Sequence, residues 1–218
     1  IREHHGFIDK FIGDAVMAIF PGQPENALNA AVDMLSQLRL YNIHRQHSHY
    51  KSIHVGIGLH TGNVMLGTIG ESERMDGTVI ADAVNLTARL EGLTKRYGAS
   101  ILISEHTLAK LTEPQTYNHR FLGKIQVKGK NEAVSVFEIY DGDPEKVREL
   151  KMETNADFEE GLQHYFAKEF VAAAGCFKQV LGVNPTDKTA RLYLERSAQF
   201  MVHGVPEGWQ GVEVIENK

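Results

Sequence analysis

Apolar and polar positions along the first two thirds of the chain follow two different periods. The two-residue period of strands occurs at 6–20, where a turn at Ile12-Gly13-Asp14 makes it a hairpin, at 53–59, at 64–68, and in the segments ILIS, RFLGKIQV and AVSVFEIY. The helical period occurs at 26–41, at 81–96 and, more briefly, at 105–111. The polar stretch 44–52 is predicted to be a loop or a frayed helix end, and 71–77 is predicted to be a loop. Strands and helices that interleave in this way predict an α+β domain with helices packed on a mainly antiparallel sheet.

The last third of the chain has a different pattern. A charged linker is predicted at 143–155, after a first domain at 1–142 and before a helical tail at 156–218. In the tail, 156–201 has the period of a helical hairpin, two helices joined at 183–186. Tetratricopeptide units carry glycine, alanine, phenylalanine and proline at the offsets found here. Glu160 and His164 depart from that pattern, because large residues are expected there. One such unit cannot bury its own apolar face, so the tail is expected to pack on the first domain or on a protein partner.

Charge and cysteine content narrow the class of protein. The formal charge of −5 argues against a nucleic-acid surface, which is normally basic. No run of 18 apolar residues suggests a membrane segment, so a cytoplasmic location is expected, although a longer parent protein could be membrane-associated. The single cysteine, Cys176, lies in an apolar helical stretch and is expected to be a buried thiol. The crowded His44, His47 and His49 lack cysteine partners, so zinc is not predicted there.

Two pairs of polar residues have spacings that suit chemistry. Lys10 and Asp14 flank the glycine-containing turn of the first hairpin, and a rim carboxylate is a good Mg²⁺ ligand. The same spacing also suits a solvated Lys–Asp pair on a surface turn. Asn85 and Arg89 are four apart on one helix face, where an amide and a guanidinium can bind ribose and phosphate oxygens or simply face solvent. Lys128 lies in a VKGK hairpin loop that suits a polyphosphate, although this signal alone is weak.

Four segments in order are more specific than any of these pairs. KFIGDAVMAIF, HVGIGLHTGNVMLGTIG, TVIADAVNLTARLEGL and FLGKIQVKGKNEAVSVFEI closely resemble the catalytic domains of class III adenylyl cyclases, over roughly residues 5–140. The resemblance implies a ferredoxin-like, mainly antiparallel sheet with packed helices. It also implies that the opening strand, which carries the family's first metal aspartate, precedes position 1 and is missing from this sequence.

The resemblance further implies a homodimer that makes 3′,5′-cyclic AMP and pyrophosphate from ATP, with two Mg²⁺ or Mn²⁺ ions in each active site. Asp14 matches one of the two aspartates that hold these metals. In this family one protomer supplies the metal aspartates, and the other supplies the contacts to base, ribose and phosphate.

Five further residues match positions that contact the nucleotide in this family. Lys10 and Thr78 match the pair that reads the adenine ring. Asn85 matches the asparagine that orients the ribose, and Arg89 matches the arginine that stabilises the transition state at the α-phosphate. Lys128 matches the lysine at the terminal phosphates.

Hydrogen-bonding logic favours ATP over GTP. Lys10 can donate to adenine N1, and the Thr78 hydroxyl can accept from the N6 amino group. Guanine presents the reverse pattern and would require an acceptor at position 10, so a guanylate cyclase is disfavoured. Another alternative is a catalytically inactive cyclase-like module that works through protein contacts, with the tail as its docking surface.

Overall fold

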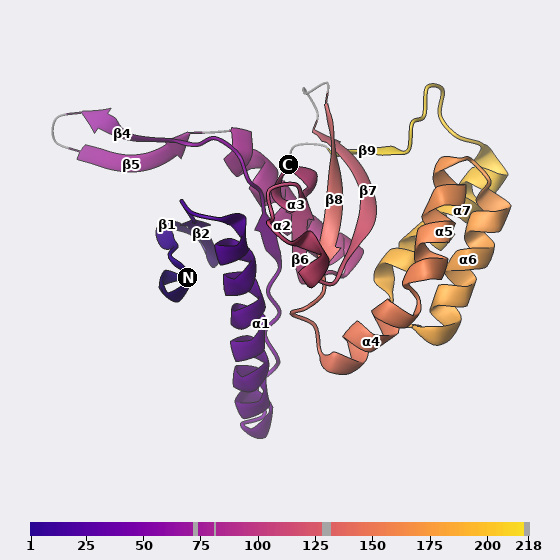
Figure 1. The fold of residues 1–218 in the computed structure, drawn as a ribbon, viewed down its shortest axis with the longest axis horizontal. Helices are drawn as coiled ribbons and strands as arrows, with labels where there is room; N and C mark the ends of the chain where they lie inside the picture. The colour runs from indigo at the N-terminus through magenta and orange to yellow at the C-terminus, as the bar shows by residue number, and fades with distance from the viewer. Residues whose placement is uncertain (72–73, 81, 128–131, 216–218) are drawn as a thin grey trace.

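A five-stranded mixed sheet with the strand order β3-β6-β8-β7-β9 forms the centre of the protein (Figure 1). The computed structural model describes residues 1–71, 74–80, 82–127 and 132–215. The strands of this sheet are β3 (Ile57–Leu59), β6 (Ile101–Ser104), β7 (His119–Val127), β8 (Ala133–Ile139) and β9 (Val212–Ile215). β6 and β7 run antiparallel to β8, whereas the outer pairs β3–β6 and β7–β9 are parallel. The predicted α+β fold class is confirmed.

Helices cover both faces of this sheet, and its inner strand β6 is therefore buried on both sides. Ile101 and Ile103 pack with α1 (Pro24–His47), and Leu102 points to the opposite face, where α2 (Asp82–Tyr97) and the tail helices pack. Alternate residues of a strand face opposite sides, so the apolar run ILIS supplies both cores. A short helix α3 (Glu105–Leu108) and two 3₁₀ turns, Arg2–His4 and Pro114–Thr116, complete this part of the chain.

Two hairpins lie outside the central sheet. β1 (Phe7–Ile12) pairs with β2 (Ala15–Ile19) around the predicted turn, and β4 (Met65–Glu71) pairs with β5 (Arg74–Ile80) (Figure 1). The loop predicted at 71–77 was therefore wrong, because most of it is β5. Its polar side chains do not prevent strand formation, since the ladder to β4 satisfies the backbone groups.

The sequence left open a loop or a helix end at 44–52, and the structure shows both: α1 continues past the predicted end near Tyr41 to His47, and a loop follows. The end of this helix is tied to the returning chain by Asn42. Its side-chain amide donates to the Ile53 carbonyl at 2.8 Å and its carbonyl accepts from the Ile53 amide at 2.8 Å. The helix also begins earlier than the predicted period at 26–41, at Pro24, a residue suited to a first turn.

The last third of the chain contains more helices than the pattern predicted. They are α4 (Glu145–Glu153), α5 (Asn155–Phe166), α6 (Phe170–Val183) and α7 (Lys188–His203). The predicted joint at 183–186 is present, but the single helix expected before it is broken between α5 and α6, where Lys168 has a left-handed φ of 66°. Composition gave no sign of this break, because a lysine rarely adopts that conformation. The segment predicted as a charged linker contains α4.

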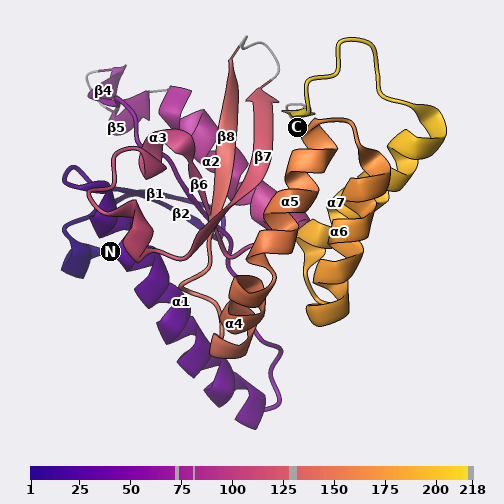
Figure 2. The ribbon, with the colours of Figure 1, turned by 45° about the vertical axis from the view of Figure 1, so that its right-hand side comes forward.

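The tail packs on the first domain. Phe158, Phe177 and Tyr193 of the tail share one buried cluster with Leu90 of α2 and Leu122 of β7. After α7 the chain returns to the sheet and adds β9 beside β7, an edge strand that the pattern did not predict (Figure 2). The sequence left open whether the tail packs on the first domain or on a protein partner, and the structure shows that it packs on the first domain. Within the described ranges, no helix is both long and apolar enough to cross a bilayer.

Candidate active site

Helix α2 carries Asn85 and Arg89, and its position is set by two glycines of the neighbouring segment. A Cβ atom on Gly58 of β3 would lie 2.4 Å from the Glu91 backbone nitrogen, and one on Gly56 would lie 2.0 Å from the Thr94 hydroxyl. Only glycine permits this close approach of helix and strand. The packing buries Leu90 and Leu93 of α2 and leaves Asn85 exposed and Arg89 half-buried, one turn apart.

The carboxyl end of α2 is held by the tail. The Thr189 hydroxyl of α7 donates to the Tyr97 carbonyl at 2.8 Å, which satisfies a carbonyl at the end of the helix. Glu213 of β9 forms ion pairs with Arg96 of α2 and with Arg196 of α7, the second at 2.7 Å, and accepts from the Tyr97 hydroxyl at 3.2 Å. Burial, followed by the charge of Glu213, raises the pKa of Tyr97, so this hydroxyl stays a donor. The tail therefore fixes the helix that carries Asn85 and Arg89.

The first hairpin carries Lys10 and Asp14. Gly13 adopts φ 62° and closes the turn, and Asp14 follows it with an exposed side chain. Lys10 lies next to a register irregularity in β1, and its ammonium is 3.3 Å from the Asp9 carboxylate. An exposed carboxylate at a turn fits a divalent metal that keeps most of its coordination shell for water and phosphate oxygens.

The structure thus groups four of the six predicted residues into two pairs. Lys10 and Asp14 share the hairpin β1–β2, and Asn85 and Arg89 share α2. Thr78 lies in β5 opposite Gly67, but its side chain lies outside the described residues. Lys128 also lies outside them.

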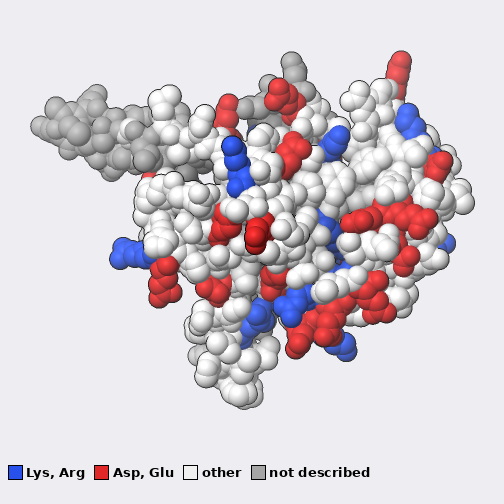
Figure 3. Space-filling view, in the orientation of Figure 1, with Lys and Arg blue, Asp and Glu red and all other residues white. Residues whose placement is uncertain are grey.

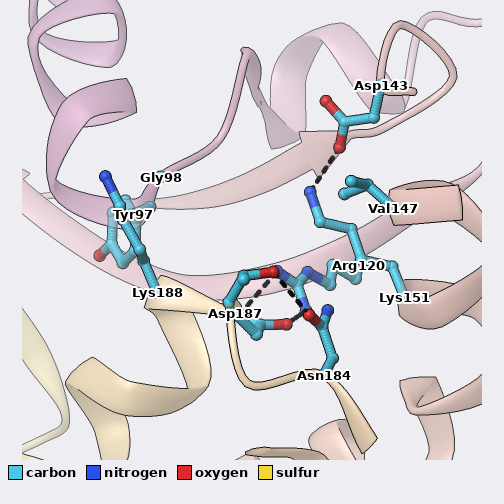
Figure 4. Close-up of a pocket in the computed structure, with 10 residues that line it drawn as sticks. Tyr97, Gly98, Arg120, Asp143, Val147, Lys151, Asn184, Asp187 and Lys188 are labelled. Atoms are coloured by element: carbon cyan, nitrogen blue, oxygen red, sulfur yellow. Dashed lines mark hydrogen bonds and ion pairs between the residues drawn. The ribbon is translucent and has the colours of Figure 1, made fainter.

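A cluster of buried charges behind α2 was missed by the sequence analysis. Arg120 of β7 donates to Glu138 of β8 at 2.6 Å. It also donates to Asp187, the N-cap of α7, at 2.6 Å (Figure 4). Lys151 of α4 donates to Glu138 at 2.6 Å and to Asp143 at 2.5 Å. Arg120 and Glu138 are directly paired across the strands, so opposite charges at interior strand positions were the available signal.

Four of these charged residues line a small cleft between the sheet and the tail: Arg120, Asp143, Lys151 and Asp187. Its volume of about 90 Å³ is enough for a few water molecules, whereas pockets for organic ligands are roughly 300–1,000 Å³. Asn184 and Lys188 line the same cleft from the tail side (Figure 4). A nucleotide does not fit there, so this cluster is structural and joins the tail to the sheet.

Comparison with known proteins shows the family to which this fold belongs. Residues 2–140 match the adenylate and guanylate cyclase catalytic domain family, and the chain belongs to it. "Adenylate cyclase" of Anabaena cylindrica is 47% identical over 145 residues, which cover 64% of this chain and 29% of that protein.

Two further comparisons extend this result. "Adenylate cyclase, terminal-differentiation specific" of Dictyostelium discoideum is 37% identical over 205 residues, covering 91% of this chain and 10% of that protein. This similarity reaches into the helical tail. The solved structure of a bacterial light-regulated adenylyl cyclase is 28% identical with a TM-score of 0.55, covering 66% of this chain and 42% of that one. The chain spans less than a third of the length of the two curated relatives.

Proposed function

We propose that this chain is the catalytic part of an adenylate cyclase, which converts ATP to 3′,5′-cyclic AMP and pyrophosphate at a site shared by two copies. The supporting observation is the arrangement of the predicted residues. The metal-binding carboxylate Asp14 lies at an exposed hairpin turn, while Asn85 and Arg89 lie on a separate helix. The adenylate cyclases among its relatives support the choice of reaction.

In the proposed reaction the ribose 3′-oxygen attacks the α-phosphate of ATP, and pyrophosphate leaves. Asn85 hydrogen-bonds the ribose and thereby orients the 3′-hydroxyl toward phosphorus. The guanidinium of Arg89 lies beside the α-phosphate, where negative charge grows in the transition state and a fixed cation is most effective. Lys128 holds the terminal phosphates that leave.

Asp14 contributes one carboxylate to the two divalent ions, Mg²⁺ or Mn²⁺, that the proposed site would hold. Such ions, when bound, supply positive charge next to the phosphates and lower the pKa of a nearby hydroxyl. The exposed position of Asp14 at the turn fits this role, because Mg²⁺ prefers oxygen donors and completes its shell with water and phosphate.

Lys10 supports ATP as the substrate. The family includes both adenylate and guanylate cyclases, so the fold does not choose the base. An ammonium at position 10 donates a hydrogen bond, which suits the acceptor N1 of adenine and opposes the N1–H donor of guanine. The Thr78 hydroxyl would accept from the adenine N6 amino group.

Complementation between two inactive variants tests the shared site. In the full parent protein, Asp14→Ala and Arg89→Ala should each abolish cyclic AMP formation, because one removes a metal ligand and the other the transition-state cation. In a mixed dimer one site carries both changes and the other carries neither. Random pairing makes about half of the dimers mixed, so recovery of about a quarter of the wild-type rate is expected from two-fold symmetry.

Two controls make the complementation experiment decisive. Subunit exchange is followed with differently tagged copies, and mixing Asp14→Ala with a second, tagged Asp14→Ala chain should restore nothing. If exchange occurs and the Asp14→Ala and Arg89→Ala mixture stays inactive, the site is not shared between chains. If either variant alone keeps wild-type activity, that residue does not have the proposed role.

A further inference from the structure

The two residues that depart from the tetratricopeptide pattern lie next to the only cysteine of the chain. Glu160 and His164 are four apart on α5, so they project from the same face of the helix. Cys176 lies on α6, which packs antiparallel to α5 in the helical hairpin. One carboxylate oxygen of Glu160, one ring nitrogen of His164 and the Cys176 sulfur lie within 4.8 Å of one another.

The spacing between two of these atoms is already that of metal ligands. His164 Nε2 lies 3.6 Å from Glu160 Oε1. Ligands at about 2.0–2.3 Å from a tetrahedral Zn²⁺ ion are about 3.5 Å apart, so these two atoms need little movement to share an ion. The Cys176 residue is largely buried, with 9% of its surface exposed to solvent.

The other nitrogen of the imidazole has the partner that metal-binding histidines usually have. His164 Nδ1 lies 2.5 Å from Glu169 Oε2, at the start of α6. When Nδ1–H donates to this carboxylate, the lone pair of Nε2 points away from Glu169 and is available to a metal. Acidic side chains also gather on the surface over α5, which favours a cation there (Figure 3).

We propose that Glu160, His164 and Cys176 form a binding site for a zinc-class divalent transition-metal ion. Thiolate and imidazole select such ions over Mg²⁺, whose ligands are oxygens. Binding exchanges the thiol proton of Cys176 for a metal–sulfur bond and releases that proton to solvent, with no change in oxidation state. A water molecule completes a fourth position. The ion joins α5 to α6 and stabilises the tail, which in turn holds the end of α2.

Protection of the thiol in the unmodified chain is the first test. Cys176 is the single cysteine, so a thiol-reactive dye reports on this site alone. We expect one equivalent of Zn²⁺ to slow its modification at least tenfold, a chelator to restore the rate, and millimolar Mg²⁺ to have no effect. Cobalt(II) should give the near-ultraviolet absorption of a thiolate–cobalt bond. If Zn²⁺ leaves the rate unchanged and Co²⁺ gives no such band, the site does not bind metal.

Variants then assign the ligands. Cys176→Ser and His164→Gln should each lower Zn²⁺ affinity, measured by calorimetry, at least tenfold. Glu169→Gln should lower it by about tenfold, because a neutral amide oxygen accepts a weaker hydrogen bond from Nδ1–H than a carboxylate does. His47→Gln is the matched control in the crowded histidines of α1 and should bind Zn²⁺ as the wild type does. If His47→Gln loses the zinc and Cys176→Ser keeps it, the proposal is overturned in favour of a surface histidine site. The thiol-protection result does not depend on whether any variant folds.

Discussion

The tail side of the sheet and the first hairpin bury their apolar side chains to opposite degrees. Phe158, Phe177 and Leu122 at the tail interface are fully buried. On the hairpin β1–β2, Phe11 is 69% and Ile12 is 59% exposed. Exposed large apolar side chains that are grouped on one element mark a surface that another molecule covers. The apolar surface on the tail side of the domain is thus covered by the chain itself, whereas the side that carries Asp14 has the properties of an interface.

The two regions also differ in whether their charged side chains are buried and paired or exposed. At the tail interface three carboxylates and two cations are buried and joined by hydrogen bonds of 2.5–2.6 Å, with Arg120 also 4.4 Å from the centre of the Phe158 ring. On the hairpin, Asp14 is exposed. Buried charges are retained only when they are paired, so those at the tail serve the fold of the chain. An exposed carboxylate at a turn is free of that constraint and can serve a metal.

Removing the central cation of the tail interface should have the largest effect on stability. Arg120→Ala leaves Glu138 and Asp187 buried without their common partner, and breaking a buried ion pair costs about 3–5 kcal/mol. Urea unfolding measures the loss. Arg191→Ala, at an exposed position on α7, is the control and should change stability by less than about 0.5 kcal/mol. Equal effects of the two changes would mean that the tail interface contributes little to the fold.

Acid should weaken the same interface. Burial alone would raise the pKa of Asp187, but the neighbouring Arg120 guanidinium outweighs it and lowers the pKa; Glu138 behaves in the same way, with Arg120 and Lys151 as its partners. A carboxyl whose pKa is lower in the folded state stabilises the fold above its unfolded pKa, and that stability is lost as the pH falls through the folded pKa. The free energy of unfolding should therefore decrease from about pH 5 downward.

Asp187→Asn separates the charge of this residue from its role as a helix cap. Asparagine caps helices as well as aspartate does, so the hydrogen bond to the Ala190 amide can be kept. The variant should be less stable at pH 6 by about 1.5–3 kcal/mol, the contribution of a charged hydrogen bond, and should lose less on acidification. Glu195→Gln, at an exposed position on the same helix α7, should keep the wild-type pH dependence. A variant curve parallel to that of the wild type would exclude Asp187 as a source of the acid sensitivity.

The hydrophobic period was enough to predict the sheet strands, the first hairpin and α2, because each pairs a regular pattern with a clear turn or stop residue. Gly98, for example, adopts φ 68° directly after α2. The period was not enough for β9 or for α4. Four residues, Val212–Ile215, form a strand only because the edge of β7 offers backbone partners, and such long-range pairing leaves no local signal. Lys151 of α4 was assigned to a charged linker because the pattern does not show that its ammonium is buried against Glu138 and Asp143.

The candidate site was predictable to a different degree. The positions of Lys10, Asp14, Asn85 and Arg89 on one hairpin and one helix follow from local spacing, and the structure has them there. Their roles do not follow from spacing, because the same residues suit a solvated surface. The roles came from the order of four segments and remain proposals. The interface charges were missed because a sequence does not show which charged residues of a strand face inward.

Replacing an exposed apolar residue of the hairpin should have the smallest effect on the fold and a clear effect on assembly. Phe11→Ser removes a side chain that is 69% exposed in the single chain, so the free energy of unfolding should change by less than about 0.5 kcal/mol. If the proposed dimer covers this face, the same change should weaken dimerisation at least tenfold, or about 1.4 kcal/mol, in sedimentation measurements on the full parent protein. Cyclic AMP formation should fall together with dimerisation at low protein concentration and recover at high concentration.

Val202→Ser is the matched control, since Val202 is 75% exposed at the end of α7, and this change should affect neither stability nor dimerisation. A Phe11→Ser chain that unfolds would show that the hairpin belongs to the protomer's own core. A stable variant that dimerises like the wild type would show that the exposed face of the hairpin is not the interface, and the contrast between the two regions would then have another cause.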